Sequence, residues 1–252
     1  MNIVCWLGLI LNETVKNWLS MKAFYYPKPT LDYDLAAYLY GFDKIGYTCT
    51  PMTSSFQAQE KDVLVGDTNQ VGKLYPSLYK MEDFPPELQK FYKRSITLKT
   101  WKECLNAKSG KHFFKPKRKG VFTPFVSDLP LVSHLDMYGY LHVSERADVW
   151  VQDPLTFMSE FRVFVYEGVI QDVRPYSGDP FLIPEKWFVE NAVQTFNKEY
   201  PYIIDVGITK EQGQVVIEVN NGCCFGTYGL DPLIAAKMYR DFFKFLQKES
   251  SY

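Results

Sequence analysis

Two stretches of this sequence each predict an antiparallel β-hairpin, and together they restrict the fold more than any other feature. Residues 160–176 hold two β-branched and aromatic runs that meet at Glu167 and Gly168, and residues 202–220 hold two more around a second glycine-containing turn. Short turns of this kind between such runs are typical of hairpins. Residues 184–200 lie between them and repeat apolar side chains at every fourth position, which predicts a helix. Hairpins separated by a helix indicate an α+β fold for this half of the chain.

Polar side chains interrupt the second hairpin. Asp205 lies within an otherwise apolar run, where a carboxylate needs a partner. In the next strand, alternation places Glu218 and Asn220 on one face. The apolar neighbours Ile217 and Val219 are expected on the other face. Strand pairing would bring Asp205 close to Glu218, and two carboxylates repel each other unless a cation lies between them. These oxygens suit Mg²⁺, although Glu218 and Asn220 taken alone are more simply explained as solvent-facing at a hairpin end.

The composition argues against some classes of partner. The chain has 252 residues, of which 46% are hydrophobic and 17% aromatic, enough for a sizeable core. Its 28 basic and 29 acidic residues give a net charge of -1, which provides no general attraction to nucleic acid or to an anionic membrane. The apolar run at residues 3–11 is too short to span a bilayer and lacks the features of a signal peptide. We therefore expect no nucleic-acid or membrane partner, and the oligomeric state is not indicated.

The cysteines and histidines indicate neither a disulfide framework nor a zinc site. The five cysteines are odd in number and include no C-x-x-C pair. This usage is typical of a reducing compartment, so we expect a cytoplasmic protein. The three histidines, His112, His134 and His142, lack the spacing of metal ligands.

The beginning of the chain predicts a small α/β lobe over residues 21–93. Strand patterns at 22–26 and 61–67 flank a helix pattern at 31–42. Residues 1–20 precede a second methionine, and we interpret them as an N-terminal extension. The alternative is a short helix packed on the surface.

The remaining residues, 94–252, are expected to form the larger domain. Strand patterns at 111–117 and 147–153 precede the two hairpins. A helix that starts at two prolines is predicted over 85–96, at the boundary with the N-terminal lobe, and a last helix is predicted to begin after Asp231.

Four motifs follow one another in this larger domain. They are "KHFFKPKRKG" at 111–120, "VQDPLTFMSEFRVFV" at 151–165, "IIDVGI" at 203–208 and "VVIEVNNG" at 215–222. In this order they resemble the ATP-grasp superfamily, and most of all the small bacterial and phage domains of the clade named for two arginines and one lysine. The similarity spans about residues 94–245. It implies an ATP-grasp fold, in which a small N-terminal α/β lobe is followed by two α+β subdomains that clamp a nucleotide.

The resemblance implies roles for the basic residues of the first motif. Lys115 corresponds to a lysine that contacts the nucleotide phosphates. Lys117 lies in the loop that covers those phosphates, and this loop is basic here rather than glycine-rich. A second phosphate ligand is expected upstream, with Lys99 as the candidate and Arg94 as the alternative.

The later motifs imply three further groups of residues. Glu160 and Arg162 match an S-E-x-R pattern whose arginine contacts phosphates, and Arg174 falls where relatives place an arginine near the acyl-phosphate. A hinge segment hydrogen-bonds adenine, largely through its backbone, and consists of Val151, Gln152 and Asp153. The implied Mg²⁺ ligands are Asp205, Glu218 and Asn220.

These expectations describe an ATP-dependent ligase that joins a carboxylate to an amine or a similar nucleophile. ATP with Mg²⁺ or Mn²⁺ would phosphorylate the carboxylate, and the nucleophile would then displace phosphate, so that ADP and phosphate are released. Such chemistry depends on positioning and charge neutralisation and needs no side-chain nucleophile. The implied substrates are small-molecule or peptide carboxylates and amines, and the N-terminal lobe is expected to select them.

Each assignment has a simpler alternative. Lys115 could be a surface lysine, Arg162 an ordinary ion-pair partner, and Arg174 a structural residue. The five basic residues from Lys111 to Lys119 could form a solvated face or a nucleic-acid patch. For the whole protein, the alternative is a catalytically inactive ATP-binding or interaction module. A nucleotidyl-transferring nucleic-acid ligase is not supported, because the sequence contains no K-x-D-G motif.

Overall fold

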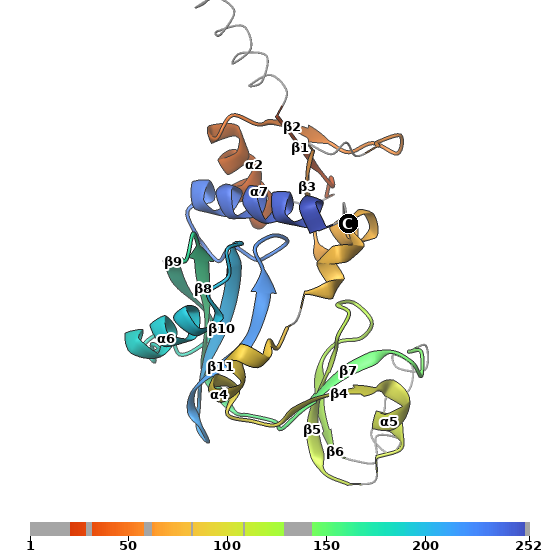
Figure 1. Cartoon of the computed structure of the whole chain (residues 1–252), viewed down its shortest axis with the longest axis vertical. Coiled ribbons are helices and arrows are strands. Elements are labelled where there is room, and N and C mark those ends of the chain that lie inside the picture. The colour runs from red at the N-terminus through yellow and green to blue at the C-terminus, as the bar shows by residue number, and fades with distance from the viewer. Residues whose placement is uncertain are drawn as a thin grey trace, which may run out of the picture.

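The structure, a computed structural model, describes most of the chain from residue 21 to residue 249 (Figure 1). The described ranges are 21–28, 32–57, 62–81, 83–107, 109–128 and 143–249. The predicted extension at residues 1–20 lies outside them, as do His134 and His142. Within these ranges no helix has both the length and the apolar character needed to cross a bilayer.

The N-terminal part forms the predicted α/β lobe. Its three-stranded parallel sheet has the order β2-β1-β3. The strands are β1 (Lys22–Tyr25), β2 (Thr48–Pro51) and β3 (Val63–Val65). Helix α2 (Tyr33–Lys44) connects β1 to β2, and the Asp32 side chain caps it by accepting a hydrogen bond from the Leu35 amide at 2.9 Å. Parallel neighbours need such a crossover, which distinguishes this lobe from the rest of the chain.

The C-terminal helix packs on this lobe although it is last in the chain. Helix α7 (Pro232–Glu249) begins after Asp231, as predicted, and lies beside α2 in Figure 1. Its Tyr239 is fully buried in the core of the lobe. A Cβ atom at Gly41 of α2 would lie 2.0 Å from the Pro232 carbonyl oxygen, so this close contact between the helices requires glycine.

Four short elements connect the lobe to the rest of the chain. They are α3 (Thr68–Leu74), the 3₁₀ helices η1 (Pro76–Lys80) and η2 (Pro86–Leu88), and α4 (Gln89–Tyr92). The helix predicted over 85–96 is therefore shorter than expected. It ends at Tyr92, because the next residue, Lys93, has a left-handed φ of 49°, and a strand that was not predicted begins at Ile96.

The second region is a four-stranded antiparallel sheet, which we call the small sheet, with the order β4-β7-β5-β6. Its elements are β4 (Ile96–Thr100), α5 (Trp101–Leu105), β5 (Lys111–Pro116), β6 (Phe125–Asp128) and β7 (Asp148–Gln152). Lys115 lies opposite Trp150. Phe113 lies opposite Gln152. Opposed side chains point the same way, so these four share one face, while the other face packs on Trp101 of α5.

The third region is a four-stranded antiparallel sheet, which we call the large sheet, with the order β11-β10-β8-β9. Its elements are β8 (Phe157–Tyr166), β9 (Val169–Gly178), α6 (Lys186–Phe196), β10 (Tyr202–Thr209) and β11 (Gly213–Asn221). Both predicted hairpins are present, and Glu167 and Gly168 form the first turn with φ values of 54° and 71°. Helix α6 covers one face (Figure 1), where Phe188 packs in one cluster with Val163 and Ile204.

A β-bulge changes the position of one residue in the second hairpin. Asp205 lies opposite Glu218, but the next pair along the ladder skips Ile217. We predicted that Ile217 shares a face with Val219, and this was wrong. Val219 packs in the cluster beneath α6, whereas Ile217 lines a cavity together with Glu218. Strict alternation fails at this point because the bulge inserts one extra residue.

Candidate active site

One row of charged side chains crosses the large sheet. It runs over β11, β10, β8 and β9 and consists of Glu218, Asp205, Arg162 and Arg174. Each residue lies directly opposite the next in the strand register, and directly opposed side chains point to the same face. The row therefore carries two carboxylates at one end and two guanidinium groups at the other. All four residues were candidates from the sequence, and the structure brings them together.

Asp205 and Arg162 form a bidentate ion pair at the centre of the row. Arg162 Nε donates to Asp205 Oδ1 at 2.9 Å, and Arg162 Nη2 donates to Oδ2 at 2.8 Å. Asp205 is only 2% exposed, so this pair supplies the partner that its apolar surroundings demand. The Arg162 guanidinium also lies 5.0 Å from the ring centre of Tyr228. Burial opposes its charge, but the hydrogen bonds to Asp205 raise the pKa of Arg162 further above its usual value.

Lys115 reaches this row from the small sheet. Its ammonium group contacts the carboxylates of Glu218 and Asp83 at the same time. Burial disfavours the charged lysine, yet these two carboxylates raise the pKa of Lys115. Burial likewise favours protonated Glu218, but the charges of Lys115 and Lys119 outweigh it and hold the pKa of Glu218 at about 2. Glu218 and Lys115 are therefore both charged at neutral pH.

Asp83 is a site residue that the sequence analysis missed. It precedes η2, and its carbonyl oxygen accepts a hydrogen bond from the Val219 amide at 2.8 Å. This bond fixes the segment around Asp83 along the free edge of β11, next to Glu218. Asp83 and Lys115 are 32 positions apart in the chain, and no local pattern marks the aspartate. Only the strand order of the folded protein could have revealed the contact.

The third predicted metal ligand, Asn220, joins the two carboxylates. Its Nδ2 donates to Asp205 Oδ2 at 2.9 Å and to Glu218 Oε1 at 3.1 Å. Its Oδ1 accepts from Lys119 Nζ at 2.8 Å. The three candidates thus contact one another, with their negative charges balanced by lysine and arginine.

The chemistry of this donor set decides whether it could hold Mg²⁺. In the part of the chain that the structure describes, no group of three His, Cys, Asp or Glu side chains could hold a metal ion. Asp205, Glu218 and Asn220 nevertheless offer two carboxylates and one amide oxygen within hydrogen-bonding distance of one another. A rotation of the Asn220 amide would turn its oxygen toward the carboxylates in place of its nitrogen. The set therefore fits a hard divalent cation that takes over the neutralising role of the lysines.

A cavity of about 460 Å³ lies between the two sheets, and we call it the apolar cavity. Its walls include, from both sheets and the connecting segment, Phe84, Arg94, Phe113, Lys115, Gln152, Phe157, Glu160, Tyr176, Ile217 and Glu218. Glu160 Oε2 accepts a hydrogen bond from the Tyr176 hydroxyl at 3.0 Å. Lys115 Nζ lies 5.2 Å from the ring centre of Phe84. This cavity therefore combines flat rings, which suit an aromatic ligand, with charged groups of both signs, among them Lys115, Glu160 and Glu218.

The two candidates for a second phosphate ligand occupy different places. Arg94 lines the apolar cavity, but its guanidinium is bonded to the protein. It donates to the carbonyl oxygens of Val216 at 2.9 Å and Ile217 at 2.7 Å, and to Gln152 Oε1 at 3.0 Å. Arg94 therefore closes the free edge of β11, and burial lowers its pKa to about 10. Lys99 is exposed and belongs to neither cavity lining described in this subsection.

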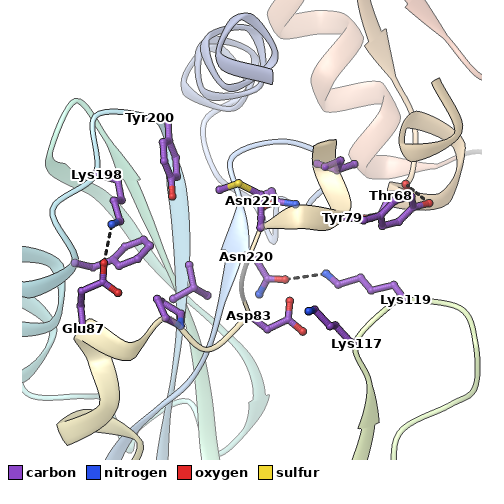
Figure 2. A pocket seen from close by; sticks show the side chains of 15 residues that line it. Thr68, Tyr79, Asp83, Glu87, Lys117, Lys119, Lys198, Tyr200, Asn220 and Asn221 are labelled. Carbon is purple, nitrogen blue, oxygen red and sulfur yellow. Dashed lines mark hydrogen bonds and ion pairs between the residues drawn. The ribbon is translucent and has the colours of Figure 1, made fainter. Parts of the chain in front are cut away.

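A second cavity, of about 240 Å³, is lined by charges of both signs, and we call it the polar cavity. Figure 2 shows Lys117 and Lys119 reaching toward Asp83 and Asn220. At the far side of this cavity, Lys198 and Glu87 form an ion pair with an N–O distance of 2.8 Å. The remaining labelled residues of its wall are Thr68, Tyr79, Tyr200 and Asn221.

The two cavities follow each other along β11. Ile217 and Glu218 line the apolar cavity, whereas Asn220 and Asn221 line the polar one. An elongated ligand lying along this strand would therefore pass from apolar walls to charged walls. The three candidate metal ligands lie close to the point where one environment changes into the other.

The other predicted site residues take more peripheral positions. Val151 packs in the core of the small sheet, so it can serve a ligand only through its backbone. Asp153 Oδ2 accepts from the Ser95 amide at 3.0 Å, which engages its carboxylate within the protein. Arg174 Nη2 pairs with Asp172 Oδ2 at 2.6 Å and remains 41% exposed. It can therefore change partner more easily than Arg162.

Comparison with known proteins identifies the family. A sequence model of ATP-grasp domains, that of family 2 in the clade named for two arginines and one lysine, matches residues 91–238, more than half of the chain. Among solved structures, the D-cycloserine synthetase DcsG has a TM-score of 0.58 at 10% identity, covering 88% of this chain and 99% of that one. A RimK domain ATP-grasp protein from Sphaerobacter thermophilus DSM 20745 has a TM-score of 0.57 at 14% identity, covering 88% and 98%. Among curated proteins, none matches this sequence significantly.

A D-alanine–D-alanine ligase from Bacillus anthracis has a TM-score of 0.52 at 10% identity, covering 92% of this chain and 100% of that one. At such low identities these likenesses establish the fold, and they confirm the predicted ATP-grasp architecture. The sequence match is independent of them and confirms the resemblance on which the site residues were chosen. This chain belongs to the ATP-grasp domain proteins, in family 2 of the clade named for two arginines and one lysine.

Proposed function

We propose that this protein is an ATP-dependent ligase that joins a carboxylate to an amine or similar nucleophile through an acyl-phosphate. One observation carries the proposal. Asp205, Glu218 and Asn220 contact one another at the boundary between an apolar and a polar cavity, with Lys115 and Arg162 beside them. This arrangement has both the oxygen donors for Mg²⁺ or Mn²⁺ and the cations for phosphates.

In this proposal the apolar cavity holds the nucleotide base, beside the hinge residues Val151, Gln152 and Asp153. The triphosphate then extends along β11, past Lys115 and Glu160, toward the polar cavity. The cation, bound by Asp205, Glu218 and Asn220, would neutralise the phosphate oxygens. Lys117, which lines the polar cavity, would lie near the terminal phosphate.

The residues of the chain would contribute charge and position. The substrate carboxylate oxygen attacks the γ-phosphorus, and the bond from that phosphorus to the β-γ bridging oxygen breaks, so that ADP leaves. The amine then attacks the acyl carbon, the bond from that carbon to the phosphate oxygen breaks so that phosphate leaves, and the nitrogen loses a proton to solvent. Lys115 and Arg162 would stabilise the charge that develops during the first step. Arg174 would contact the acyl-phosphate, because its exposure allows it to leave Asp172.

The identity of the substrates is proposed only by class. The names of two fold relatives, a D-alanine–D-alanine ligase and a D-cycloserine synthetase, are those of ligases and synthetases of small molecules. We propose small-molecule or peptide carboxylates and amines, with the lobe at residues 21–93 selecting among them for the domain at 94–252. The four free cysteines among the described residues support the proposal of a cytoplasmic location.

A second candidate is a nucleotide-binding module without turnover. It is favoured by one observation, which is that Lys115, Lys119 and Arg162 already neutralise the donor set without any metal. Such a module would bind ATP equally well in the presence and in the absence of Mg²⁺.

The test is ADP release from ATP with Mg²⁺ across a panel of amino acids, peptides and polyamines, followed by mass spectrometry of the product. We expect ADP release that depends on both a carboxylate and an amine, and none from Glu218→Gln. AMP with pyrophosphate would overturn the mechanism. ADP release that no substrate stimulates, with ATP affinity unchanged by a chelator in calorimetry, would favour the binding module.

A further inference from the structure

Tyr228 has a left-handed backbone conformation that a tyrosine rarely adopts. Its φ is 47°, and Gly229 follows it with a φ of 86°. Glycine has no Cβ and tolerates this region, whereas a bulky side chain there is a genuine outlier. Burial does not compensate for the strain, because Tyr228 is 48% exposed. A strained residue that the fold nevertheless keeps directs attention to what its ring contacts.

The N-terminal lobe holds the backbone beside Tyr228. Asp34 Oδ1 of α2 accepts hydrogen bonds from the Thr227 amide at 2.8 Å and from the Thr227 hydroxyl at 2.6 Å. The Thr227 carbonyl oxygen in turn accepts a hydrogen bond from the Leu230 amide at 2.9 Å. Tyr228 therefore lies inside a turn that is closed by its own hydrogen bond and attached to α2, and these bonds impose its left-handed conformation.

The ring of Tyr228 lies against the guanidinium group of Arg162, at the distance of 5.0 Å given above. The same ring stacks on Tyr176, with 5.4 Å between the ring centres and 28° between the ring planes. A cation is attracted to an aromatic face, and more strongly where water is excluded, as it is from the Arg162 side chain, which is only 12% exposed. The Tyr228 ring therefore restricts how far the guanidinium plane can tilt.

Arg162 keeps two donors for a ligand. A guanidinium group has five N–H groups, and three of those of Arg162 are bonded within the protein. Nε and Nη2 donate to Asp205, and Nη1 donates to the Gly226 carbonyl oxygen at 3.3 Å. The second N–H of Nη1 and that of Nη2 have no partner among the residues that the structure describes. Two donors on one planar group can bind two oxygens of a single phosphate, but only while the plane keeps its orientation.

We infer that Tyr228 is a positioning residue that acts through Arg162. Its ring holds the guanidinium plane so that the two free N–H groups stay directed at the terminal phosphate of the nucleotide. The bonds between Asp34 and Thr227 maintain the backbone strain that places the ring there. The inference rests on the proposed binding of ATP and deepens it, because it adds a residue that orients one of the phosphate contacts.

The test compares the affinities of the full chain for ADP and for AMP-PNP, an ATP analogue whose terminal phosphate is not readily transferred. Both are titrated with Mg²⁺ in a calorimeter, and the ratio of the two dissociation constants reports the contacts of the terminal phosphate. Tyr228→Asn removes the ring but introduces a residue that tolerates the left-handed conformation. We expect AMP-PNP to bind this variant about fivefold more weakly than it binds the parent protein, and ADP to bind both equally. The melting temperature should not fall, because the relieved strain offsets the lost ring contact.

Two further variants serve as controls. Tyr228→Phe keeps the ring and should restore the ratio of the parent protein, since the hydroxyl group has no part in the contact. Phe181→Asn removes a ring that is 90% exposed in the turn before α6, and it should leave both affinities and the melting temperature unchanged.

The outcomes separate this inference from the proposed function. If Tyr228→Asn lowers the melting temperature and weakens both nucleotides together, the role of Tyr228 is structural, and if it changes neither affinity, the ring does not orient Arg162. Either result would overturn the assignment of Tyr228 alone. Equal affinity of the parent protein for ADP and AMP-PNP would overturn the contact between Arg162 and the terminal phosphate, and with it the role of Tyr228. Absence of binding of either nucleotide to the parent protein would overturn the proposed function as well.

Discussion

The two antiparallel sheets differ in how they satisfy their polar side chains. In the large sheet, Asp205 and Arg162 bind each other within one row, and the partners come from the sheet itself. In the small sheet, Lys115 finds its carboxylates on other segments of the chain. Three buried polar atoms have no partner among the described residues: Gln152 Nε2 and Trp150 Nε1 belong to the small sheet, and Ser159 Oγ belongs to the large sheet. The large sheet therefore pairs its central charges within itself, whereas the small sheet depends on other segments for its charged partners and has more donors left without one.

This difference follows from how each sheet is covered. The large sheet packs α6 on one face, and on the other face Phe164 and Ile203 belong to the core of the N-terminal lobe. The small sheet packs one face on α5 and turns Lys115 and Gln152 toward the apolar cavity. Donors can remain available on the part of this face that borders the cavity.

Removing the arginine at the centre of the large sheet should have the largest effect. Arg162→Met leaves the buried carboxylate of Asp205 without its bidentate partner. Breaking a buried ion pair in this way costs about 3–5 kcal/mol, and we expect about 3 kcal/mol because Asn220 still donates to Asp205. The free energy of unfolding in urea, measured without nucleotide, gives this value.

The double variant Arg162→Met/Asp205→Asn is the control for charge. It leaves no unpaired buried charge, so it should regain at least half of the lost stability. If Arg162→Met lowers the free energy of unfolding by less than about 1 kcal/mol, the row of charges in the large sheet is not preassembled. The two sheets would then not differ in this respect.

Removing Lys115 from the small sheet should lower stability by a smaller amount, and this amount should depend on Mg²⁺. Lys115→Met leaves Asp83 and Glu218 facing each other, and we expect a loss of about 2 kcal/mol in a chelating buffer. Millimolar Mg²⁺ should restore part of this stability, because a cation between the carboxylates removes their repulsion. Thermal unfolding with and without Mg²⁺ measures both values.

Lys111→Met is the matched control, since Lys111 is exposed at the start of the same strand. It should change neither the stability nor its dependence on Mg²⁺. If Lys115→Met is destabilised equally in chelator and in Mg²⁺, the two carboxylates do not form a cation site.

The parts of the site that were predictable are those with a local pattern. Asp205 stood out because a carboxylate in an apolar strand needs a partner, and the hairpin register then placed Glu218 opposite it. Arg162 followed from the motif of the neighbouring strand. Periodicity and turn residues were sufficient for both hairpins, for α6 and for α7, because each of these elements is long enough to show its repeat.

The parts that were missed depend on contacts between distant segments or on short elements. Asp83 joins the site only because its segment runs along the edge of β11, and Arg94 becomes a partner of Gln152 by closing the same edge. The bulge at Ile217 breaks the alternation from which its face was predicted. Strands β4 and β6 and helix α3 are too short for a clear periodic signal.

The pH dependence of stability provides a third test of the charged contacts made by the large sheet. Tyr166 of β8 donates to Asp241 Oδ2 of α7 at 2.7 Å, which ties the large sheet to the N-terminal lobe. Burial raises the pKa of Asp241, but hydrogen bonds from Arg240, Tyr166 and Lys244 outweigh it and lower the pKa to about 2.

A depressed pKa means that this stabilisation is present above the pKa of the unfolded carboxyl, about 4. It should be lost as the pH falls from about 4 to about 2, and we expect a loss of about 1 kcal/mol because solvent screens this half-buried carboxylate. Asp241→Asn should be less stable than the parent protein at pH 7 and should approach it at about pH 2.5. Melting temperatures of the two proteins across this range give the comparison, and parallel curves would contradict a role for this carboxylate.

The smallest effect is expected at the β8–β9 turn, where the large sheet can be stabilised without touching the cavity. Glu167 has a φ of 54°, a left-handed conformation that is unfavourable for a glutamate, and Gly168 follows it with a φ of 71°. Asparagine followed by glycine is preferred in a two-residue turn of this type, so Glu167→Asn should stabilise the protein by about 0.5 kcal/mol. Gly168→Ala is the opposite control, because a Cβ atom there meets nothing within 4 Å and only the backbone strain is added. Urea unfolding should show the two changes with opposite signs, and ATP affinity should be the same in both variants. A change in ATP affinity at this turn would mean that the large sheet adjusts to the nucleotide as the small sheet does, and the distinction between the two sheets would fail.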